Sequence, residues 1–192
     1  MLHIRRGSCV YEMGNFLYSL LFRNINVVVI GLDGAGKTTV LMKMFHGNPN
    51  PHAVVHTMPT LGFNVEKLTV SGLKVNTWDL GGQEKLREFW IYHMAHLDGL
   101  VYVVDSMDRK RLQTSKDELY RILDHPEVSQ NKAPLLIMLN KCDHPDVTME
   151  ELDREFEVTT YISKSRPVKI VHTIATQDVG LRAGFEWLVS RL

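Results

Sequence analysis

A glycine-rich segment behind an apolar run carries the residue types that hold a phosphate. Residues 31–39 read GLDGAGKTT and directly follow the run NVVVI of residues 26–30. The spacing G-x-x-x-x-G-K-[ST] lets successive backbone N–H groups point at phosphate oxygens, and the helix that follows presents its positive end to the same anion. Lys37 would then reach the β- and γ-phosphates, and the Thr38 hydroxyl would ligate Mg²⁺. The residues predicted to line this site are Gly31, Asp33, Gly34, Ala35, Gly36, Lys37, Thr38 and Thr39.

A second segment, WDLGGQE at residues 78–84, places a carboxylate and a glutamine where a strand runs into a helix. An Asp at the carboxyl end of a strand beside a phosphate loop can hold Mg²⁺ through a water, which is the role predicted for Asp79. Gly82 leaves its N–H free to approach a γ-phosphate, and Gln83 can orient an attacking water. Alone, these residues would be an ordinary turn and helix start. Combined with the phosphate loop, they predict phosphoryl hydrolysis with Gln83 and Lys37 as the catalytic residues.

A third segment, NKCD at residues 140–143, follows the apolar run of residues 135–139 and has the chemistry to select a base. A carboxylate at Asp143 can accept hydrogen bonds from the N1–H and the 2-amino group of guanine. Adenine lacks the amino group and offers an acceptor at N1, so the same carboxylate would be left unpaired. A site built on such bonds discriminates by about 10⁴ to 10⁵. The sequence therefore predicts GTP in preference to ATP.

Length, charge and cysteine content narrow the class of protein. The 192 residues fit one compact domain, and 22 basic against 22 acidic residues give no net field that would attract nucleic acid. The basic triplet at residues 109–111 is too short for a basic tract, and we interpret it as solvated surface. Cys9 and Cys142 form no disulfide framework. This cysteine content suits a reducing compartment, and we expect a cytoplasmic monomer. No apolar run approaches the roughly 18 residues of a membrane-spanning helix.

Apolar, β-branched runs alternate with segments of helical period, which is typical of βα units around a mostly parallel sheet. Ser71 and Gly72 separate two of these runs as a hairpin signal, so one edge strand should be antiparallel. The sequence predicts an α/β fold of the P-loop NTPase class, with a six-stranded, mostly parallel sheet, one antiparallel edge strand and about five flanking helices. The strands are expected near residues 27–31, 63–70, 73–79, 100–105, 135–140 and 169–173, and the helices near residues 36–45, 84–95, 111–123, 149–156 and 181–191.

Together with PTLGFNVE at residues 59–66, the three motifs resemble those of the Arf and Arf-like small GTPases from about Phe16 to the C-terminus. The resemblance implies a switch that binds GTP or GDP with Mg²⁺, hydrolyses GTP slowly and recruits effectors at membranes in intracellular trafficking. It also implies that Thr60 joins Mg²⁺ only in the GTP state. On the base side, it implies that Lys141 covers the guanine ring and that the Ala175 N–H meets guanine O6, with Asn140 and Thr176 completing the nucleotide site.

The resemblance further implies three kinds of partner: an exchange factor, an activating protein and effectors. Residues 47–66 contain no arginine, so this segment cannot supply an internal arginine for hydrolysis. We therefore expect slow intrinsic turnover and dependence on an activating protein. The implied effector surface consists of Phe63, Trp78 and His93, where His93 departs from the tyrosine that the family normally has.

The N-terminal part of the chain is expected to form an extension over residues 1–25, ahead of a GTPase domain at residues 26–192. The resemblance implies that GTP binding releases an N-terminal amphipathic helix onto a membrane, giving peripheral attachment in the GTP state. Phe16 to Phe22 could form that helix. A segment packed permanently on the domain is the alternative. Gly14 could carry a lipid only if translation begins at Met13, because an internal glycine has no free amino group.

Two other functions account for part of the pattern. A P-loop kinase of small molecules would share residues 31–39, but it needs a lid over its acceptor substrate and would make the NKCD segment coincidental. A GTP-binding module that does not cycle would have the same residues, because a sequence shows residues and not rates.

Overall fold

Six strands form one sheet in the order β2-β3-β1-β4-β5-β6. A computed structural model of the chain describes residues 25–46, 58 and 60–192. The strands in this part of the chain are β1 (Ile25–Ile30), β2 (Phe63–Val70), β3 (Leu73–Leu80), β4 (Gly99–Asp105), β5 (Leu135–Asn140) and β6 (Val168–His172). All neighbouring pairs are parallel except β2 and β3. The predicted six-stranded sheet with one antiparallel edge strand is confirmed.

The antiparallel edge is made by the turn that the sequence predicted. Ser71 and Gly72 have φ angles of 50° and 83°, and they connect the paired residues Val70 and Leu73. A two-residue hairpin turn in which both central residues have positive φ matches the twist of the flanking strands. This turn therefore sends β2 back along β3 and leaves β2 at the edge of the sheet.

All five predicted helices occur in the described residues, with two short ones in addition. The helices are α2 (Lys37–His46), α3 (Glu84–Arg87), α4 (Leu112–Leu123), α5 (Pro126–Asn131), α6 (Met149–Glu155), α7 (Ser163–Ser165) and α8 (Leu181–Val189), with the 3₁₀ helices η1 (Glu88–His93), η2 (Arg109–Arg111) and η4 (Ala175–Gln177) and the π-helix η3 (Val158–Ile162). The helix expected over residues 84–95 is a single α-turn continued by η1. Helix α5 has one buried residue, Val128, so its sequence has no apolar period to indicate it.

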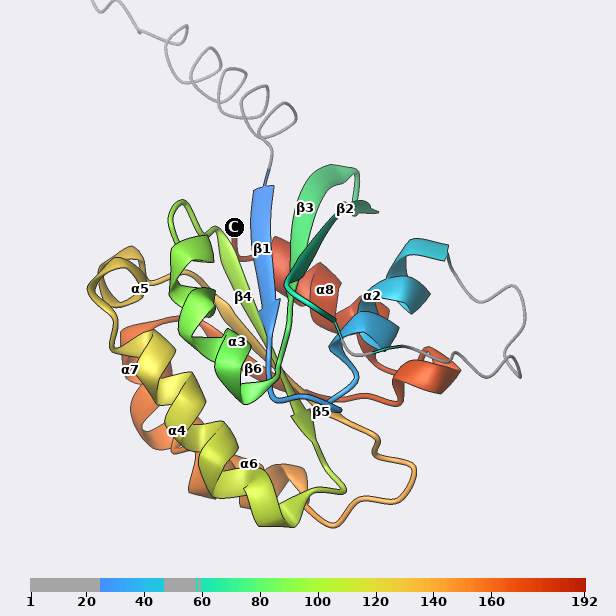
Figure 1. Cartoon of the computed structure of the whole chain (residues 1–192), viewed down its shortest axis with the longest axis vertical. Coiled ribbons are helices and arrows are strands. Elements are labelled where there is room, and N and C mark those ends of the chain that lie inside the picture. The colour runs from blue at the N-terminus through green and yellow to red at the C-terminus, as the bar shows by residue number, and fades with distance from the viewer. Residues whose placement is uncertain (1–24, 47–57, 59) are drawn as a thin grey trace, which may run out of the picture.

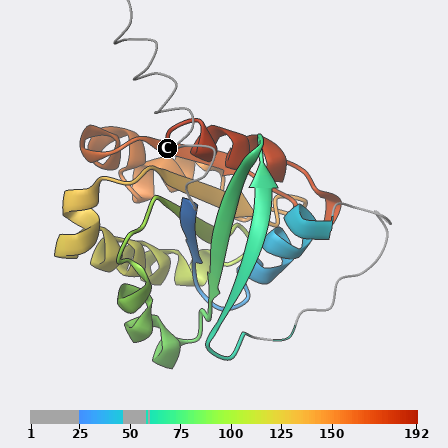
Figure 2. The same cartoon turned by 90° about the horizontal axis from the view of Figure 1, so that it is seen from above.

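Successive strand residues point to opposite faces of the sheet, and helices cover both faces (Figures 1 and 2). Val27 and Val29 pack in a core with α2 and α8, whereas Val28 and Ile30 pack in a second core with η1, α4 and α6. Strands that are buried on both faces have continuous apolar sequences, and β4 and β5 both have such sequences.

Parallel strands bring their carboxyl ends to one edge of the sheet, and ligands bind beyond that edge in open α/β folds. Strands β1, β3 and β5 end at Ile30, Leu80 and Asn140, directly before or within the three motifs. The fold therefore collects the predicted chemistry at this edge. The expected N-terminal helix and Gly14 lie outside the described residues. No described helix has the length and apolarity needed to cross a membrane.

Candidate functional site

The loop between β1 and α2 lies so close to two other segments that a side chain at Gly36 in the loop, or at Gly82 opposite it, would clash. A Cβ added to Gly36 would come 2.4 Å from Asn140 Nδ2, and one added to Gly82 would come 2.5 Å from the backbone N of Asp33. Gly36 also has a φ of 94°, which disfavours a side chain. The phosphate loop is thus in direct contact with both the residue 82 segment and the residue 140 segment.

Lys37 begins α2 and lies inside this loop with only 6% of its surface exposed. Its Nζ donates a hydrogen bond of 3.0 Å to the carbonyl oxygen of Leu32. Burial lowers the pKa of Lys37 from 10.5 to about 8, although the carboxylates of Asp79 and Asp33 oppose this change. A lysine held in this way is a fixed donor beside the backbone of the loop.

A cleft of about 480 Å³ opens above these residues. This volume lies within the range of about 300–1,000 Å³ that is usual for small-molecule sites. The residues lining the cleft are Asp33, Gly34, Gly36, Lys37, Thr38, Thr39, Met58, Thr60, Gly82, Gln83 and Lys141. Of the predicted site residues, Gly31, Ala35, Asp79, Asn140, Asp143, Ala175 and Thr176 are outside this lining.

Three oxygen-bearing side chains from separate segments meet at one side of the cleft. The Thr38 hydroxyl donates to Asp79 Oδ2 at 2.6 Å and lies 3.0 Å from the Thr60 hydroxyl, which is itself 3.5 Å from Asp79 Oδ2. Asp79 is 3% exposed, and its second oxygen, Oδ1, is buried without a hydrogen-bond partner. Burial raises the pKa of the Asp79 carboxyl, and the hydrogen bond from Thr38 opposes this.

This arrangement fits a hard cation. Mg²⁺ prefers oxygen ligands and keeps several waters, so it needs few protein ligands. An unpaired buried carboxylate oxygen costs free energy that a nearby cation or its water would offset. The described residues contain no group of three His, Cys, Asp or Glu that could hold a metal on its own. The threonine and aspartate set is therefore suited to Mg²⁺ shared with a phosphate.

Gln83 lies at the rim of the cleft, directly before α3. Its carbonyl oxygen accepts a hydrogen bond of 2.8 Å from the Leu86 N–H, and the Gly82 carbonyl oxygen accepts one of 3.1 Å from the Asp33 N–H. The backbone on either side of Gln83 is thus anchored, once to α3 and once to the phosphate loop.

Asn140 joins the remaining parts of the site and is only 2% exposed. Its Nδ2 donates to the carbonyl oxygen of Ala35 at 2.9 Å, and its Oδ1 accepts from the Ala175 N–H at 3.1 Å and from the Thr173 hydroxyl at 3.2 Å. The Ala175 N–H, which was expected to meet a guanine oxygen, is thus bonded to Asn140 in this structure.

The other residues expected around the base lie at the same edge of the sheet. Lys141 Nζ forms an ion pair of 2.7 Å with Asp105 Oδ2, which fixes the lysine side chain at the cleft. Asp143 is exposed on the loop that follows β5, and Thr176 is exposed in η4, which follows β6. Their side chains are accessible to a ligand.

A model of the ADP-ribosylation factor family matches residues 13–192. The chain belongs to the ADP-ribosylation factor family. As an Arf-like small GTPase, it is a GTP hydrolase and a nucleotide-regulated switch that uses GTP or GDP with Mg²⁺. The predicted family, enzyme class and cofactors are therefore confirmed. Regulators and effectors are partners throughout this family.

Individual relatives agree with the family assignment. The chain is 37% identical over 185 residues to ADP-ribosylation factor-like protein 1 of Saccharomyces cerevisiae, covering 92% of this chain and 96% of that protein. It is 39% identical over 171 residues to the protein of the same name from Drosophila melanogaster, covering 88% and 90%. Among solved structures, it is similar to the Arl6 BBS3 small GTPase from Trypanosoma brucei with bound nucleotide analogue GppNp, at a TM-score of 0.77 and 29% identity, covering 88% of this chain and 99% of that one.

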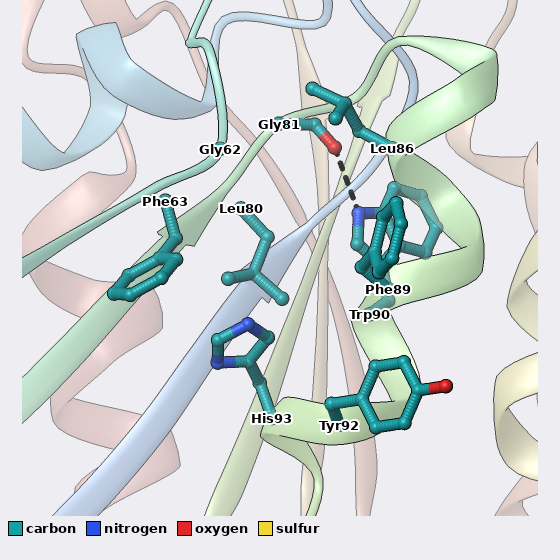
Figure 3. A pocket seen from close by; sticks show the side chains of 9 residues that line it. All are labelled: Gly62, Phe63, Leu80, Gly81, Leu86, Phe89, Trp90, Tyr92 and His93. Carbon is teal, nitrogen blue, oxygen red and sulfur yellow. Dashed lines mark hydrogen bonds between the residues drawn. The ribbon is translucent and has the colours of Figure 1, made fainter.

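The Arf-like chain also has an aromatic surface outside the cleft described above. The rings of Phe63, Trp78 and His93 contact one another, with centroid separations of 4.9 to 5.7 Å. Phe63 and His93 border a pocket of about 220 Å³ between β2, β3 and η1 (Figure 3). Phe63 is 52% exposed, and burial lowers the pKa of His93. The structure thus brings together the three residues predicted as an effector surface.

Two arginines at the site were not predicted from the sequence. Arg87 and Arg111 both form ion pairs with Asp33, at 3.2 and 3.1 Å. The interpretation of residues 109–111 as solvated surface is therefore wrong for Arg111, which is half-buried against the phosphate loop. An arginine has no fixed spacing from its partner in a sequence, so only the tertiary structure identifies these contacts.

Proposed function

We propose that the cleft between residues 31–39, Thr60, residues 79–83 and residues 140–143 binds the guanine nucleotide and its Mg²⁺. The observation that carries this proposal is the meeting of Thr38, Thr60 and Asp79 beside an unpaired buried carboxylate oxygen. These residues come from three segments far apart in sequence, and the set has the oxygen chemistry of a Mg²⁺ site.

The phosphates would be held by the backbone N–H groups of the loop and by Lys37. Thr38 and Thr60 would ligate Mg²⁺ directly, and Asp79 would hold it through a water. The metal ion supplies charge neutralisation for the phosphoryl oxygens. Thr60 takes part only when the γ-phosphate is present, so the position of its segment reports the nucleotide state.

On the base side, the Asp143 carboxylate would accept hydrogen bonds from the guanine N1–H and 2-amino group. The aliphatic part of Lys141 would cover the ring, in the orientation that its ion pair with Asp105 favours. Asn140 would keep Ala175 and its neighbour Thr176 next to the phosphate loop, so that base and phosphate contacts belong to one rigid unit.

Hydrolysis would proceed by in-line attack of a water that Gln83 orients, with Gly82 and Lys37 stabilising charge on the γ-phosphate. Positioning supplies most of such a rate. Residues 47–66 contain no arginine that could act from within the chain. We therefore infer slow intrinsic turnover, accelerated by about 10³ to 10⁵ when an activating protein supplies an arginine.

Membrane attachment would be peripheral and would depend on the nucleotide. In this proposal, residues 26–192 form the GTPase domain, and the amphipathic segment at residues 16–22 binds the bilayer in the GTP state. Effectors would contact Phe63, Trp78 and His93, and an exchange factor would reload the site. Flotation of the full chain with liposomes should recover more protein with a non-hydrolysable GTP analogue than with GDP. Equal recovery would contradict nucleotide control, and mass spectrometry of the mature protein would show whether Gly14 is its acylated N-terminus.

Single-turnover hydrolysis tests the catalytic part of this proposal. Purified full chain, loaded with γ-labelled GTP and Mg²⁺, should release phosphate slowly and stoichiometrically. Release at a rate near the activated range would overturn the need for an activating protein, and no release would identify a module that does not cycle. Transfer of the label to a small-molecule acceptor would support the kinase alternative instead.

A further inference from the structure

Arg87, the last residue of α3, is an arginine buried beside the nucleotide site with only 7% of its surface exposed. Its Nε donates a hydrogen bond of 2.8 Å to the carbonyl oxygen of Gly82. Its terminal nitrogen NH2 lies 3.2 Å from Asp33 Oδ1 in the phosphate loop. One guanidinium group therefore connects the residue before the catalytic glutamine to the loop that holds the phosphates.

Asp33, the phosphate-loop residue that Arg87 contacts, is also held by a second arginine. Arg111, directly before α4, donates from NH1 to Asp33 Oδ1 and from NH2 to the Asp33 carbonyl oxygen, both at 3.1 Å. Burial would raise the pKa of Asp33, but the charge of Arg111 and the hydrogen bonds it receives hold that pKa below its ordinary value. Asp33 is thus an anionic partner of Arg87 that Arg111 also holds, at both its side chain and its backbone.

The opposite side of Arg87 is held by α4. NH1 of Arg87 lies 3.4 Å from Glu118 Oε1. The backbone carbonyl oxygen of Arg87 accepts a hydrogen bond of 2.9 Å from Arg121 NH2. A guanidinium presents five donors in a rigid planar fork, so one arginine can bond three acceptors at once. A lysine in this position could not bond Gly82 and Asp33 in the same geometry.

We propose that Arg87 is a positioning residue that holds the Gly82 peptide, and with it Gln83, against the phosphate loop when a γ-phosphate is bound. The inference rests on the proposed nucleotide site. The Gly82 carbonyl receives hydrogen bonds from both Arg87 and the Asp33 N–H, which fixes the orientation of the peptide that leads into Gln83. Arg87 touches neither phosphate nor water in this account. It acts through the placement of Gly82 and Gln83.

This role makes the contribution of Arg87 specific to one nucleotide state. GDP has no γ-phosphate for Gly82 and Gln83 to meet, so its binding does not depend on where these two residues lie. A non-hydrolysable GTP analogue does depend on their placement, and so does hydrolysis. A merely structural arginine would instead affect both nucleotides to the same extent.

The test compares Arg87→Gln and Arg87→Lys with Arg154→Gln, a matched control that removes an exposed arginine of α6 whose ion pair is with Glu155 and not with Arg87 or its partners. The measurements are the dissociation rates of GDP and of the non-hydrolysable GTP analogue GppNHp, together with single-turnover GTP hydrolysis by the full chain with Mg²⁺. For Arg87→Gln we expect GppNHp to dissociate about tenfold faster and hydrolysis to slow by about tenfold, with GDP dissociation changed by less than about twofold. Arg154→Gln should change each rate by less than about twofold.

Arg87→Lys keeps the charge but loses the fork, so it should show the same selectivity to a smaller extent, and it serves as the test if Arg87→Gln does not fold. Equal acceleration of GDP and GppNHp release, or unchanged hydrolysis in both variants, would overturn the inference. Failure of the unaltered protein to bind either nucleotide would instead contradict the proposed nucleotide site.

Discussion

The Thr38 hydroxyl donates a hydrogen bond of 2.6 Å to Asp79 Oδ2, joining the start of α2 to the end of β3. The other carboxylate oxygen of Asp79 is buried and has no partner among the described residues. This pair therefore brings a hydroxyl next to a carboxylate that has one unpaired oxygen, and oxygen groups of this kind are what a Mg²⁺ ion and its water prefer.

Thr38→Val should raise the Mg²⁺ requirement of the protein. Valine keeps the shape of threonine but has no oxygen to ligate the metal, so the Mg²⁺ concentration for half-maximal binding of a fluorescent GTP derivative should increase by about tenfold or more. Thr114→Val, on the exposed side of α4, is the control. An unchanged Mg²⁺ requirement in Thr38→Val would remove this residue from the metal site.

Gln83→Leu should separate hydrolysis from binding. Because Gln83 acts on water and not on the nucleotide, the variant should keep its GTP affinity within about twofold and lose about a hundredfold in single-turnover rate. Gln113→Leu changes the same residue type on the exposed side of α4 and should leave both quantities unaltered. Loss of GTP affinity in Gln83→Leu would contradict the role assigned to this side chain.

Asp143→Asn should weaken the preference for guanine. The amide keeps one acceptor but presents a donor to the guanine donors, so the affinity for GDP should fall by about a hundredfold or more. A xanthine nucleotide, which has a carbonyl oxygen in place of the 2-amino group, should gain affinity. Equilibrium titration with GDP and XDP measures both, with Asp146→Asn as the exposed control. Unchanged GDP affinity would place the base elsewhere.

His93 should titrate below its ordinary pKa of 6.5, because burial disfavours the charged ring. At pH values between this lowered pKa and 6.5, the unfolded chain binds a proton at His93 more readily than the folded chain does. The contribution of the neutral, packed His93 ring to folding stability is therefore fully present above pH 6.5 and is lost as the pH falls through the lowered pKa. An NMR titration of the His93 ring should give a midpoint under 6.5, and Phe63→Ala, which removes a contacting ring, should move it upward. A midpoint at or above 6.5 in the unaltered protein would contradict the packing of this surface.

Much of the fold was predictable because the signals are local. The two turn residues Ser71 and Gly72 are enough to predict the antiparallel hairpin of β2 and β3. The apolar runs of β4 and β5 indicate strands that are buried on both faces. Helix α5 was missed because its single buried residue, Val128, makes no periodic pattern. Local chemistry thus predicts elements that bury a regular face and misses short connecting ones.

The same distinction applies to the site. Lys37, Thr38 and Asp79 were predictable because phosphate and Mg²⁺ require these residue types at fixed distances from a strand end. Arg87 and Arg111 were not, since their common partner Asp33 is brought to them only by the tertiary fold. Residues that touch a ligand leave a pattern in the sequence, whereas residues that position them do not.

Competition for one fluorescent guanine nucleotide tests the central claim most directly. With Mg²⁺ present, GDP and GTP should displace a bound fluorescent GDP derivative from the full chain at near-stoichiometric concentrations, while ADP and ATP should fail to do so even at about a thousandfold excess. Removal of Mg²⁺ should accelerate release of the derivative. Equal displacement by adenine and guanine nucleotides, or no binding of the derivative at all, would contradict a single pocket that recognises guanine, phosphate and Mg²⁺ together.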